Sequence, residues 1–270
     1  MNKSPQIFFN SSLFRSGGTL LQNIIAQNPE FYCTPTSGLI DLLNGVLNSY
    51  EDSDKNFSLG RKNYKKATYS FINQGFKGYA SSFSSSNYFL DKNISWNFYY
   101  PLLKDIFGEV KMVCFVRDLR SVFSSIEKNF RQNPSFIIKD LPIQNTKNRL
   151  IHFLKNHSLS RDIYNIEQRI TEKNFNDILF IKFEDFCLNP QFFISKIYSF
   201  LNIPDYTHNL NYIPQLVNEN DEIHYPIGTH NIKNTIQLPK KDYEEVLGKD
   251  LCNWIYKEYE WYFQIFNYQK

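Results

Sequence analysis

The chain has 270 residues, of which 42% are hydrophobic and 21% charged, and its formal net charge is +3. This length suits one large α/β domain or two small ones, and no Pro-, Gly- or Ser-rich linker divides it. The small net charge argues against the broad basic face of a nucleic-acid-binding protein. We therefore expect a single domain over residues 1–270 that does not bind nucleic acid.

The four cysteines are scattered and form no C-x-x-C pair. This spacing argues against a zinc site and is typical of reduced thiols in a cytoplasmic protein. The N-terminus passes almost at once into a predicted strand, and no run of about 18 apolar residues occurs anywhere. The sequence thus predicts a cytoplasmic protein without a secretion signal, a membrane span or a metal.

The hydrophobic pattern predicts strands that alternate with helices. In chain order these are a strand at 6–9, a helix from Leu20, a helix at 39–47, a polar stretch at 50–86 expected to form a helix plus loops, strands at 88–90 and 112–116, helices at 119–130 and 146–171, a strand at 178–181, and helices at 190–201 and 243–263. Such alternation predicts a parallel sheet with helices on both faces.

The first predicted strand runs into a polar, glycine-bearing loop that opens a helix. The N–H groups of residues 16–19 lie at the start of this helix, where they have no acceptor in a preceding turn. Such a helix N-terminus favours phosphate or sulfate, and Arg15 adds a permanent positive charge. A simple turn with an N-cap is the alternative for the loop alone. The lysine of the Walker motif is absent, which disfavours ATP held in the usual way.

A second anion site is predicted where the strand at 112–116 ends. Arg117 follows this strand, at the edge of the sheet where open α/β proteins bind ligands. The apolar stripe of the next helix leaves Ser121 and Ser125 on its polar face, with Ser125 about two turns along. Arg117 and Ser125 thus form a second site, and two such sites suggest a ligand phosphorylated at two places.

These segments resemble the motifs of one known family. SSLFRSGGTLLQNIIAQNP resembles the 5′-phosphosulfate loop of sulfotransferases, and VCFVRDLRSVFSSIEK resembles their 3′-phosphate segment. The likeness continues in order through TPTSGLIDLL, LDKNISW, FIKFEDFCLNPQFFISKIYSFLNIP and IGTHNIK. It is greatest for bacterial-type enzymes, which are related in their motifs to tyrosyl-protein and carbohydrate sulfotransferases. The resemblance implies a P-loop-like three-layer α/β domain around a central parallel sheet.

The resemblance also implies the donor, 3′-phosphoadenosine 5′-phosphosulfate (PAPS), with no metal. The residues implied for its 5′ end are Arg15, Ser16, Gly17, Gly18, Thr19 and Leu20, and those for its 3′-phosphate are Arg117 and Ser125. The chain has Ser12 where the family usually has Gly, and Gly18 where it has Ser or Thr. Gly18 keeps the backbone donor but lacks one hydroxyl. Phe183 stands where relatives often carry Tyr, and we favour core packing as its role.

Sulfuryl transfer needs an in-line acceptor oxygen, stabilisation of the leaving phosphate and a base for the acceptor proton. Lys92, in DKNISW, resembles the lysine that the family places near the transferred group; a surface lysine is the alternative. Tyrosyl-protein relatives carry a glutamate just after the first helix, whereas residues 33–38 hold no carboxylate. Asp41 is the nearest candidate base, because it lies opposite the apolar face of its helix. A solvated Asp near the helix N-terminus is the alternative.

The late segment IGTHNIK resembles the loop that closes over the nucleotide, so His230 and Lys233 are expected at the 3′-phosphate or the adenine; a plain surface loop is the alternative. The sequence as a whole predicts a PAPS-dependent sulfotransferase with a hydroxyl acceptor, an amine being the second choice. The alternatives are a P-loop nucleotide kinase or NTPase and a non-catalytic nucleotide-binding protein. Glycan, lipid, small molecule and protein tyrosine all remain open as acceptors, and so does the oligomeric state.

Overall fold

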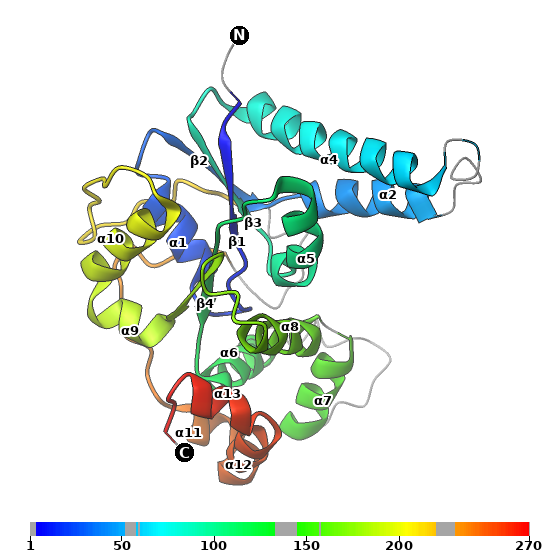
Figure 1. Ribbon diagram of the computed structural model, residues 1–270. Helices are drawn as coiled ribbons and strands as arrows, with labels where there is room; N and C mark the ends of the chain where they lie inside the picture. Colours follow the sequence, from blue (N-terminus) through cyan, green and yellow to red (C-terminus); the bar gives the residue numbers. More distant parts are fainter. Residues whose placement is uncertain are drawn as a thin grey trace.

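A computed structural model describes residues 4–51, 58, 60–132, 145–156, 158–219 and 230–269. Within these residues five parallel strands form one sheet in the order β2-β3-β1-β4-β5. The strands are β1 (Gln6–Asn10), β2 (Phe31–Thr36), β3 (Tyr88–Lys92), β4 (Met112–Val116) and β5 (Ile178–Lys182). Helices cover both faces of this sheet (Figure 1), so the predicted three-layer α/β fold is confirmed.

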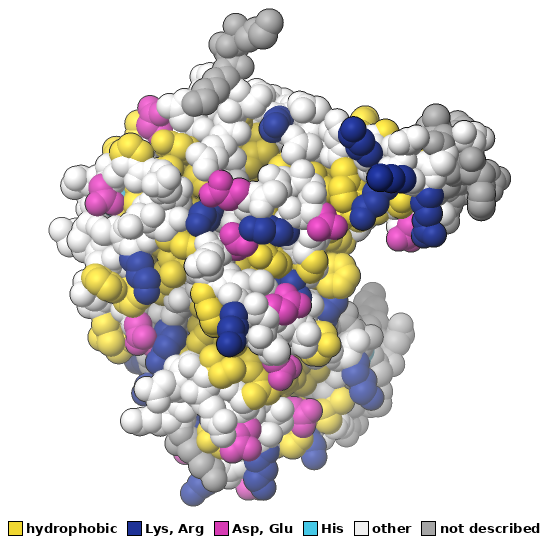
Figure 2. Space-filling view, viewed as in Figure 1, with side chains coloured by type: hydrophobic (Ala, Val, Ile, Leu, Met, Phe, Trp, Pro, Cys, Tyr) yellow, Lys and Arg dark blue, Asp and Glu magenta, His cyan; other side chains and the backbone are white. Residues whose placement is uncertain are grey.

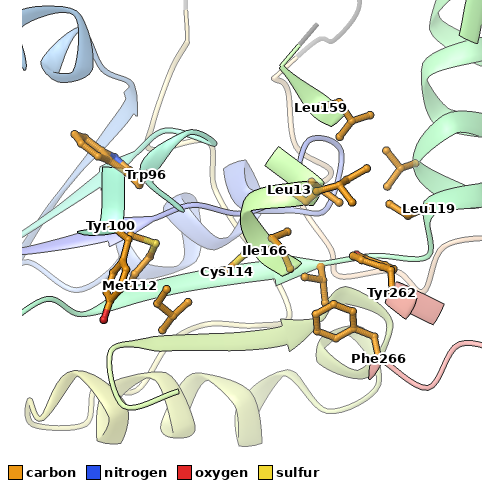
Figure 3. Packing of buried hydrophobic residues seen from close by; sticks show 14 of the residues in the cluster. Leu13, Trp96, Tyr100, Met112, Cys114, Leu119, Leu159, Ile166, Tyr262 and Phe266 are labelled. Carbon is orange, nitrogen blue, oxygen red and sulfur yellow. The ribbon is translucent and has the colours of Figure 1, made fainter. Parts of the chain in front are cut away.

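The apolar residues of β4 contribute side chains to the hydrophobic core on both faces of the sheet. Cys114 belongs to the core layer on one face and Phe115 to the layer on the other, and neither is exposed. Figure 3 shows side chains of helices far apart in the sequence meeting around β4 on the first face. Labelled side chains there come from α5 (Trp96–Phe107), α6 (Leu119–Gln132), α8 (Leu159–Thr171) and α13 (Glu260–Ile265). Burial on both faces is what a parallel sheet requires.

The second core layer lies under the helices that follow β1 and β5. They are α1 (Gly18–Ile25), α9 (Phe183–Leu188) and α10 (Pro190–Leu201). Asn189 caps α10 as its side chain accepts a hydrogen bond from the N–H of Phe192 at 3.4 Å, and Pro190 stands in the first turn. This helix therefore begins and ends where its sequence predicts.

The sequence pattern predicts neither β2 nor α5, and each contains a proline. Pro35 lies within β2, which is an edge strand and can hold proline because one side of its backbone has no partner strand. Pro101 lies within α5, where it interrupts the sequence signal of a helix. In both cases tertiary packing overrides the local pattern.

The single helices predicted over 146–171 and 243–263 are wrong. The first is divided into α7 (Thr146–Asn156) and α8, and the second into α11 (Tyr243–Leu247), α12 (Lys249–Glu258) and α13. Gly248 ends α11 with a φ of 83°, a positive value that favours glycine and that an apolar periodicity does not reveal.

Two helices project from the body of the molecule, α2 (Leu39–Glu51) and α4 (Arg61–Phe83), and they run side by side (Figure 1). Lys and Arg side chains gather where α4 begins, whereas both signs of charge are mixed over the rest of the face in Figure 2. The exposed cations in this part of α4 are Arg61, Lys62, Lys65 and Lys66. No helix in the described ranges combines the length and the apolar character needed to cross a membrane.

Candidate functional site

The side chain of Asn10 holds the loop between β1 and α1 in shape. Asn10 is fully buried, and its Oδ1 accepts hydrogen bonds from the N–H and the hydroxyl of Ser12 at 3.1 and 2.6 Å. Its Nδ2 donates to the carbonyl of Gly18 at 3.1 Å. One buried amide thus ties the beginning of the loop to the first residue of α1.

The backbone of this loop is left-handed at two positions. Gly17 has a φ of 90°, and a Cβ there would lie 2.4 Å from Cε2 of Phe183, so both conformation and space require glycine. Arg15 has a φ of 59°, which residues other than glycine rarely adopt. Strain of this kind persists where surrounding contacts fix the backbone, often at functional sites. The loop is therefore rigidly shaped at the N-terminus of α1, where backbone N–H groups can bind an anion.

The hydroxyl residues of the loop differ in what they offer a ligand. Ser16 is fully buried; its N–H donates to the carbonyl of Leu13 at 3.0 Å and its hydroxyl to the carbonyl of Phe14 at 3.5 Å. Thr19 is half-buried in the first turn of α1. The N–H of Ser16 therefore serves the turn itself, and its hydroxyl makes only a long contact at 3.5 Å.

Ser12 and Gly18, the two departures from the family pattern, are in contact. A Cβ at Gly18 would lie 2.9 Å from Cβ of Ser12. The hydroxyl of Ser12 also accepts a hydrogen bond from the N–H of Phe115 at 3.1 Å, which links the loop to β4. The side chain of Ser12 therefore occupies the space that a side chain at position 18 would need.

The two predicted anion sites touch each other. Nε of Arg15 donates to Oγ of Ser125 at 3.0 Å, and a terminal nitrogen of Arg117 donates to the carbonyl of Arg15 at 2.8 Å. The sheet topology causes this meeting, because β1 and β4 are neighbours whose carboxyl ends lie at the same edge. The loop and the start of α6 thus form one continuous surface.

A cavity of about 510 Å³ opens beside these residues. Its walls come from the loop, from the polar face of α6 and from a late segment of the chain that includes Lys233. The lining residues are Arg15, Leu20, Arg117, Ser121, Ser124, Ser125, Lys128, Phe183, Ile232, Lys233, Thr235, Gln237, Leu238, Pro239, Lys240 and Asp242. The cavity is therefore rich in cations and hydroxyls and has one aromatic wall.

Several contacts hold Arg117 in the wall of this cavity. Its backbone N–H and carbonyl both bind the hydroxyl of Tyr262, at 3.2 and 3.0 Å, and its guanidinium lies 5.7 Å from the ring of Phe183. Burial lowers the pKa of Arg117, and the nearby carboxylate of Glu184 offsets part of this effect. An arginine keeps its charge under such a shift. Arg117 is therefore a fixed positive charge in a largely dry position.

Two buried donors in the cavity wall have no hydrogen-bond partner among the described residues. They are Nε of Arg117 and Oγ of Ser124. Buried polar atoms are rarely left without partners, because each such atom costs free energy. Both atoms belong to residues that line the cavity.

Lys92 lies in a separate cluster at the carboxyl ends of β2 and β3. Its Nζ lies 2.8 Å from Oε2 of Glu219 and 3.2 Å from Oγ1 of Thr36, and Nε2 of His230 lies 3.3 Å from the same Glu219 oxygen. Burial alone would raise the pKa of Glu219, but the charge and hydrogen bond of Lys92 outweigh burial and lower that pKa. Glu219 is therefore a buried carboxylate anion held between two basic side chains.

The other predicted residues lie partly at the cavity and partly elsewhere. Asp41 is exposed in the first turn of α2 and is not among the residues that line the cavity, as the alternative of a solvated Asp near the helix N-terminus expects. His230 contacts Glu219 and does not line the cavity, whereas Lys233 does. The part of the late loop at 227–229 lies outside the described residues.

Lys128 and Glu219 are among the site residues that the sequence analysis did not single out. Lys128 lines the cavity and follows Ser121 and Ser124 at helical spacing, so the periodicity of α6 contained the signal for it. Glu219 belongs to no motif, and only the folded chain brings it to Lys92, which is 127 positions away in the sequence.

Comparisons with known proteins agree with this architecture. A model of the sulfotransferase family matches residues 7–208. The sulfotransferase domain from the curacin biosynthetic pathway is 18% identical to this chain over 96% of it and 98% of that domain, with a TM-score of 0.58. The sulfotransferase domain from the Synechococcus PCC 7002 olefin synthase is 17% identical over 92% of this chain and 96% of that domain, with a TM-score of 0.49.

Mouse sulfotransferase SULT7A1, solved in complex with PAP, is 15% identical over 95% of this chain and 90% of that one, with a TM-score of 0.47. Among curated proteins no match is found. The family model spans 202 of the 270 residues, from β1 through α10 and beyond, and includes the loop, Lys92 and Arg117. The chain therefore belongs to the sulfotransferase family.

Proposed function

We propose that this chain transfers a sulfuryl group from PAPS to a hydroxyl acceptor, with an amine as the second choice. The observation that carries the proposal is the single cavity that joins the loop at α1 to Arg117 and Ser125. PAPS is phosphorylated at two places on one nucleoside, so a ligand of this kind needs two anion-binding groups on one continuous surface.

The chemistry of the cavity supports this donor. Arg15 and Arg117 are permanent cations that line the cavity, and Leu20 of the first turn of α1 lines it as well. The buried, unpartnered donors of Arg117 and Ser124 fit an anionic ligand. Phe183 offers an apolar wall of the kind on which a nucleoside packs.

Each residue of the site has a distinct proposed role in sulfuryl transfer. PAPS supplies the sulfuryl group. Arg15 and the N–H groups of α1 stabilise the negative charge that develops on the leaving phosphate, which is the need met by fixed donors in a site that excludes water. Arg117 and Ser125 hold the 3′ end and so fix the direction of the donor. Lys92 lies at the end of β3, next to β1 in the sheet, and its proposed role is to assist at the transferred group.

The first test measures binding of the bisphosphate product, 3′-phosphoadenosine 5′-phosphate (PAP). A ligand that binds only the native state stabilises it by about 2.7 kcal/mol at a concentration 100 times its Kd. We expect PAP to raise the melting temperature of the wild type. Arg61→Ala is the control, because it removes an exposed arginine of α4 that does not line the cavity, and PAP should raise its melting temperature equally. Arg117→Ala should weaken PAP binding about 10- to 100-fold, because it removes a charge-assisted contact.

Each variant is compared with its own ligand-free melting temperature, so a loss of intrinsic stability does not imitate a loss of binding. An unchanged PAP shift in Arg117→Ala, or none in the wild type, contradicts the proposal.

The second test offers ³⁵S-labelled PAPS with a panel of phenols, alcohols, glycans and amines. Binding of PAP without transfer to any acceptor would indicate a non-catalytic nucleotide-binding protein, and Mg²⁺-dependent turnover of ATP would indicate an NTPase.

A further inference from the structure

The cluster around Glu219 is more elaborate than a surface ion pair. The side chain of Glu219 is 3% exposed and that of Lys92 is 10% exposed. Oε1 of Glu219 accepts a hydrogen bond from the N–H of Thr36 at 3.3 Å, and Oε2 faces both Lys92 and His230. A buried carboxylate with several donors is costly to assemble, because each ion loses its water. Glu219 lies next to Lys92, the lysine that the family resemblance implies for catalysis, so we infer that this buried carboxylate has a functional role.

Two amide side chains anchor the backbone on which Glu219 lies. Oδ1 of Asn23 accepts from the N–H groups of Leu216 and Val217 at 2.6 and 2.8 Å, while its Nδ2 donates to the carbonyl of Thr19 at 2.9 Å. Gln215 donates to the carbonyl of Val217 at 2.7 Å. The segment before Glu219 is therefore fastened to the first turn of α1, the same turn that bears the loop.

The opposite side of the cluster is fastened by the same glutamine. Oε1 of Gln215 accepts from the N–H of Ile232 at 3.0 Å, and its Nε2 lies 3.5 Å from the carbonyl of His230. Asn23 and Gln215 together fix Glu219 and His230 relative to α1. Lys92 is fixed separately by the sheet, where it pairs with Asn10 at the end of β1.

We propose that Glu219 is a positioning residue for sulfuryl transfer: its carboxylate, together with Thr36, holds the ammonium group of Lys92 at the carboxyl end of β3 beside the donor loop. The proposal rests on the function proposed above. A lysine side chain has four rotatable bonds and many rotamers, so a flexible ammonium group needs such a partner to be held in one position. Lys92 touches the reacting group in this scheme, and Glu219 acts through Lys92.

The step that Lys92 assists is a displacement at sulfur. The acceptor oxygen forms a bond to sulfur, and the bond from sulfur to the bridging oxygen breaks. The electron pair of that bond remains on the phosphate of PAP, and the acceptor proton is released to water. Negative charge grows on the bridging oxygen, so an ammonium group fixed beside it favours the transition state over the ground state.

A role for Glu219 as the general base is less consistent with its contacts. Both of its oxygens already accept hydrogen bonds or face cations, and Lys92 lowers its pKa. A carboxylate in this state binds a proton weakly. Positioning of Lys92 uses the same contacts without requiring a proton.

The test is a double-mutant cycle with Glu219→Gln, Lys92→Met and the double variant. Glu258→Gln, on the exposed side of α12, is the matched control. We expect Glu219→Gln to keep PAP binding within about threefold and to lower kcat for transfer from labelled PAPS about 10- to 100-fold. Glu219→Asp should recover part of this loss. The double variant should be no slower than Lys92→Met, because Glu219 has nothing to position once the lysine is gone.

A second readout needs no acceptor. Lys92→Met leaves the buried carboxylate of Glu219 without its lysine partner, so the melting temperature of this variant should fall. Adding Glu219→Gln should raise that melting temperature again. The proposal is overturned if Glu219→Gln transfers as fast as Glu258→Gln, if the double variant is slower than Lys92→Met by the full Glu219→Gln factor, or if Glu219→Gln fails to raise the melting temperature of Lys92→Met. Failure of the wild type to bind PAP would instead overturn the proposed function, and the stability cycle would still decide whether Glu219 holds Lys92.

Discussion

Ser12 and Gly18 show how two residues of the loop between β1 and α1 depend on each other. The side chain of Ser12 fills the space beside Gly18, and its hydroxyl serves Asn10 and the N–H of Phe115. A hydroxyl residue at position 18 would add a donor to the loop but would have to displace Ser12. The missing hydroxyl at position 18 is thus a packing consequence of Ser12 and not an isolated loss.

Gly18→Ser should therefore destabilise the protein by about 1–3 kcal/mol, because the added Cβ would lie 2.9 Å from that of Ser12. Ser12→Gly alone should also cost about 1 kcal/mol, since the buried N–H of Phe115 loses its acceptor. In the double variant the clash is absent, so the two losses should not add. Urea unfolding of the four proteins measures this coupling, with Gly75→Ser as control because nothing lies within 4 Å of a Cβ there. Strict additivity would contradict the packing argument.

Single residues also show what the sequence can predict. Arg15 and Arg117 were predictable because each stands next to a strand end that its own neighbours reveal. Glu219 was not, because its partner Lys92 is remote in sequence and no local spacing links them. The position of Asp41 relative to the cavity was equally hard to predict: its helix was recognised, but the surface that the helix presents to the cavity depends on the fold.

At the scale of elements, Glu127 joins α6 to α7. Its side chain is 4% exposed, and its carboxylate accepts from Nε of Arg131 at 2.7 Å and from Nε of Arg149 at 2.8 Å. Thr146, the first residue of α7, also donates to it at 3.1 Å. The carboxylate thus fixes the start of α7 against the last turns of α6, beyond the face that lines the cavity.

Glu127→Gln should lower the free energy of unfolding by about 1–3 kcal/mol at pH 7. Burial would raise the pKa of Glu127, but hydrogen bonds from Arg149 and Arg131 outweigh it and lower that pKa. The pKa of Glu127 is lower in the folded state than in the unfolded state. The stabilisation is therefore present at pH values above the unfolded-state pKa and is lost as the pH falls through the folded-state pKa. The difference between wild type and variant should therefore shrink below about pH 4. Denaturant unfolding from pH 3 to 7 measures it, with Glu258→Gln expected to stay flat; a difference that does not depend on pH would argue against the ion pairs.

The helices and strands also show which elements apolar periodicity can predict and which it cannot. The apolar pattern found the strands that are buried on both faces, because burial there leaves a continuous apolar run. It missed β2 and α5, in which Pro35 and Pro101 break the pattern, and it joined helices across Gly248. The donor loop depends on β1, α1 and β4, which the pattern did find, so the candidate site was more predictable than the helices around it.

At the scale of the whole molecule, the strand order β2-β3-β1-β4-β5 brings the site together. β1 lies between β3 and β4, so the loop after β1 is flanked by Lys92 on one side and Arg117 on the other. The alternation of strands and helices predicted a parallel sheet, but strand order comes from long-range pairing that local patterns do not encode. The meeting of Arg15 with Ser125 is a consequence of that order.

The same core holds a carboxyl group whose ionisation opposes folding. Asp162 on α8 is 2% exposed, its Oδ2 accepts from the hydroxyl of Ser158 at 2.7 Å, and its Oδ1 has no hydrogen-bond partner among the described residues. Burial raises the pKa of Asp162 to about 7, and Ser158 and the charge of Arg161 offset only part of this effect. The folded protein therefore prefers the protonated form of a group that ionises near pH 4 when unfolded.

Because the folded-state pKa is the higher one, the stability that Asp162 contributes is complete below the unfolded pKa and is lost as the pH rises through about 7. Asp162→Asn keeps the shape and removes the ionisation. We expect this variant to match the wild type within about 1 kcal/mol at pH 4 and to exceed it by about 1–3 kcal/mol at pH 8. Global unfolding in urea at several pH values measures the trend, and Asp250→Asn, at an exposed position on α12, should show none. A stability gain that is equally large at pH 4 would mean that packing around α8, and not the buried charge, limits the stability of the core.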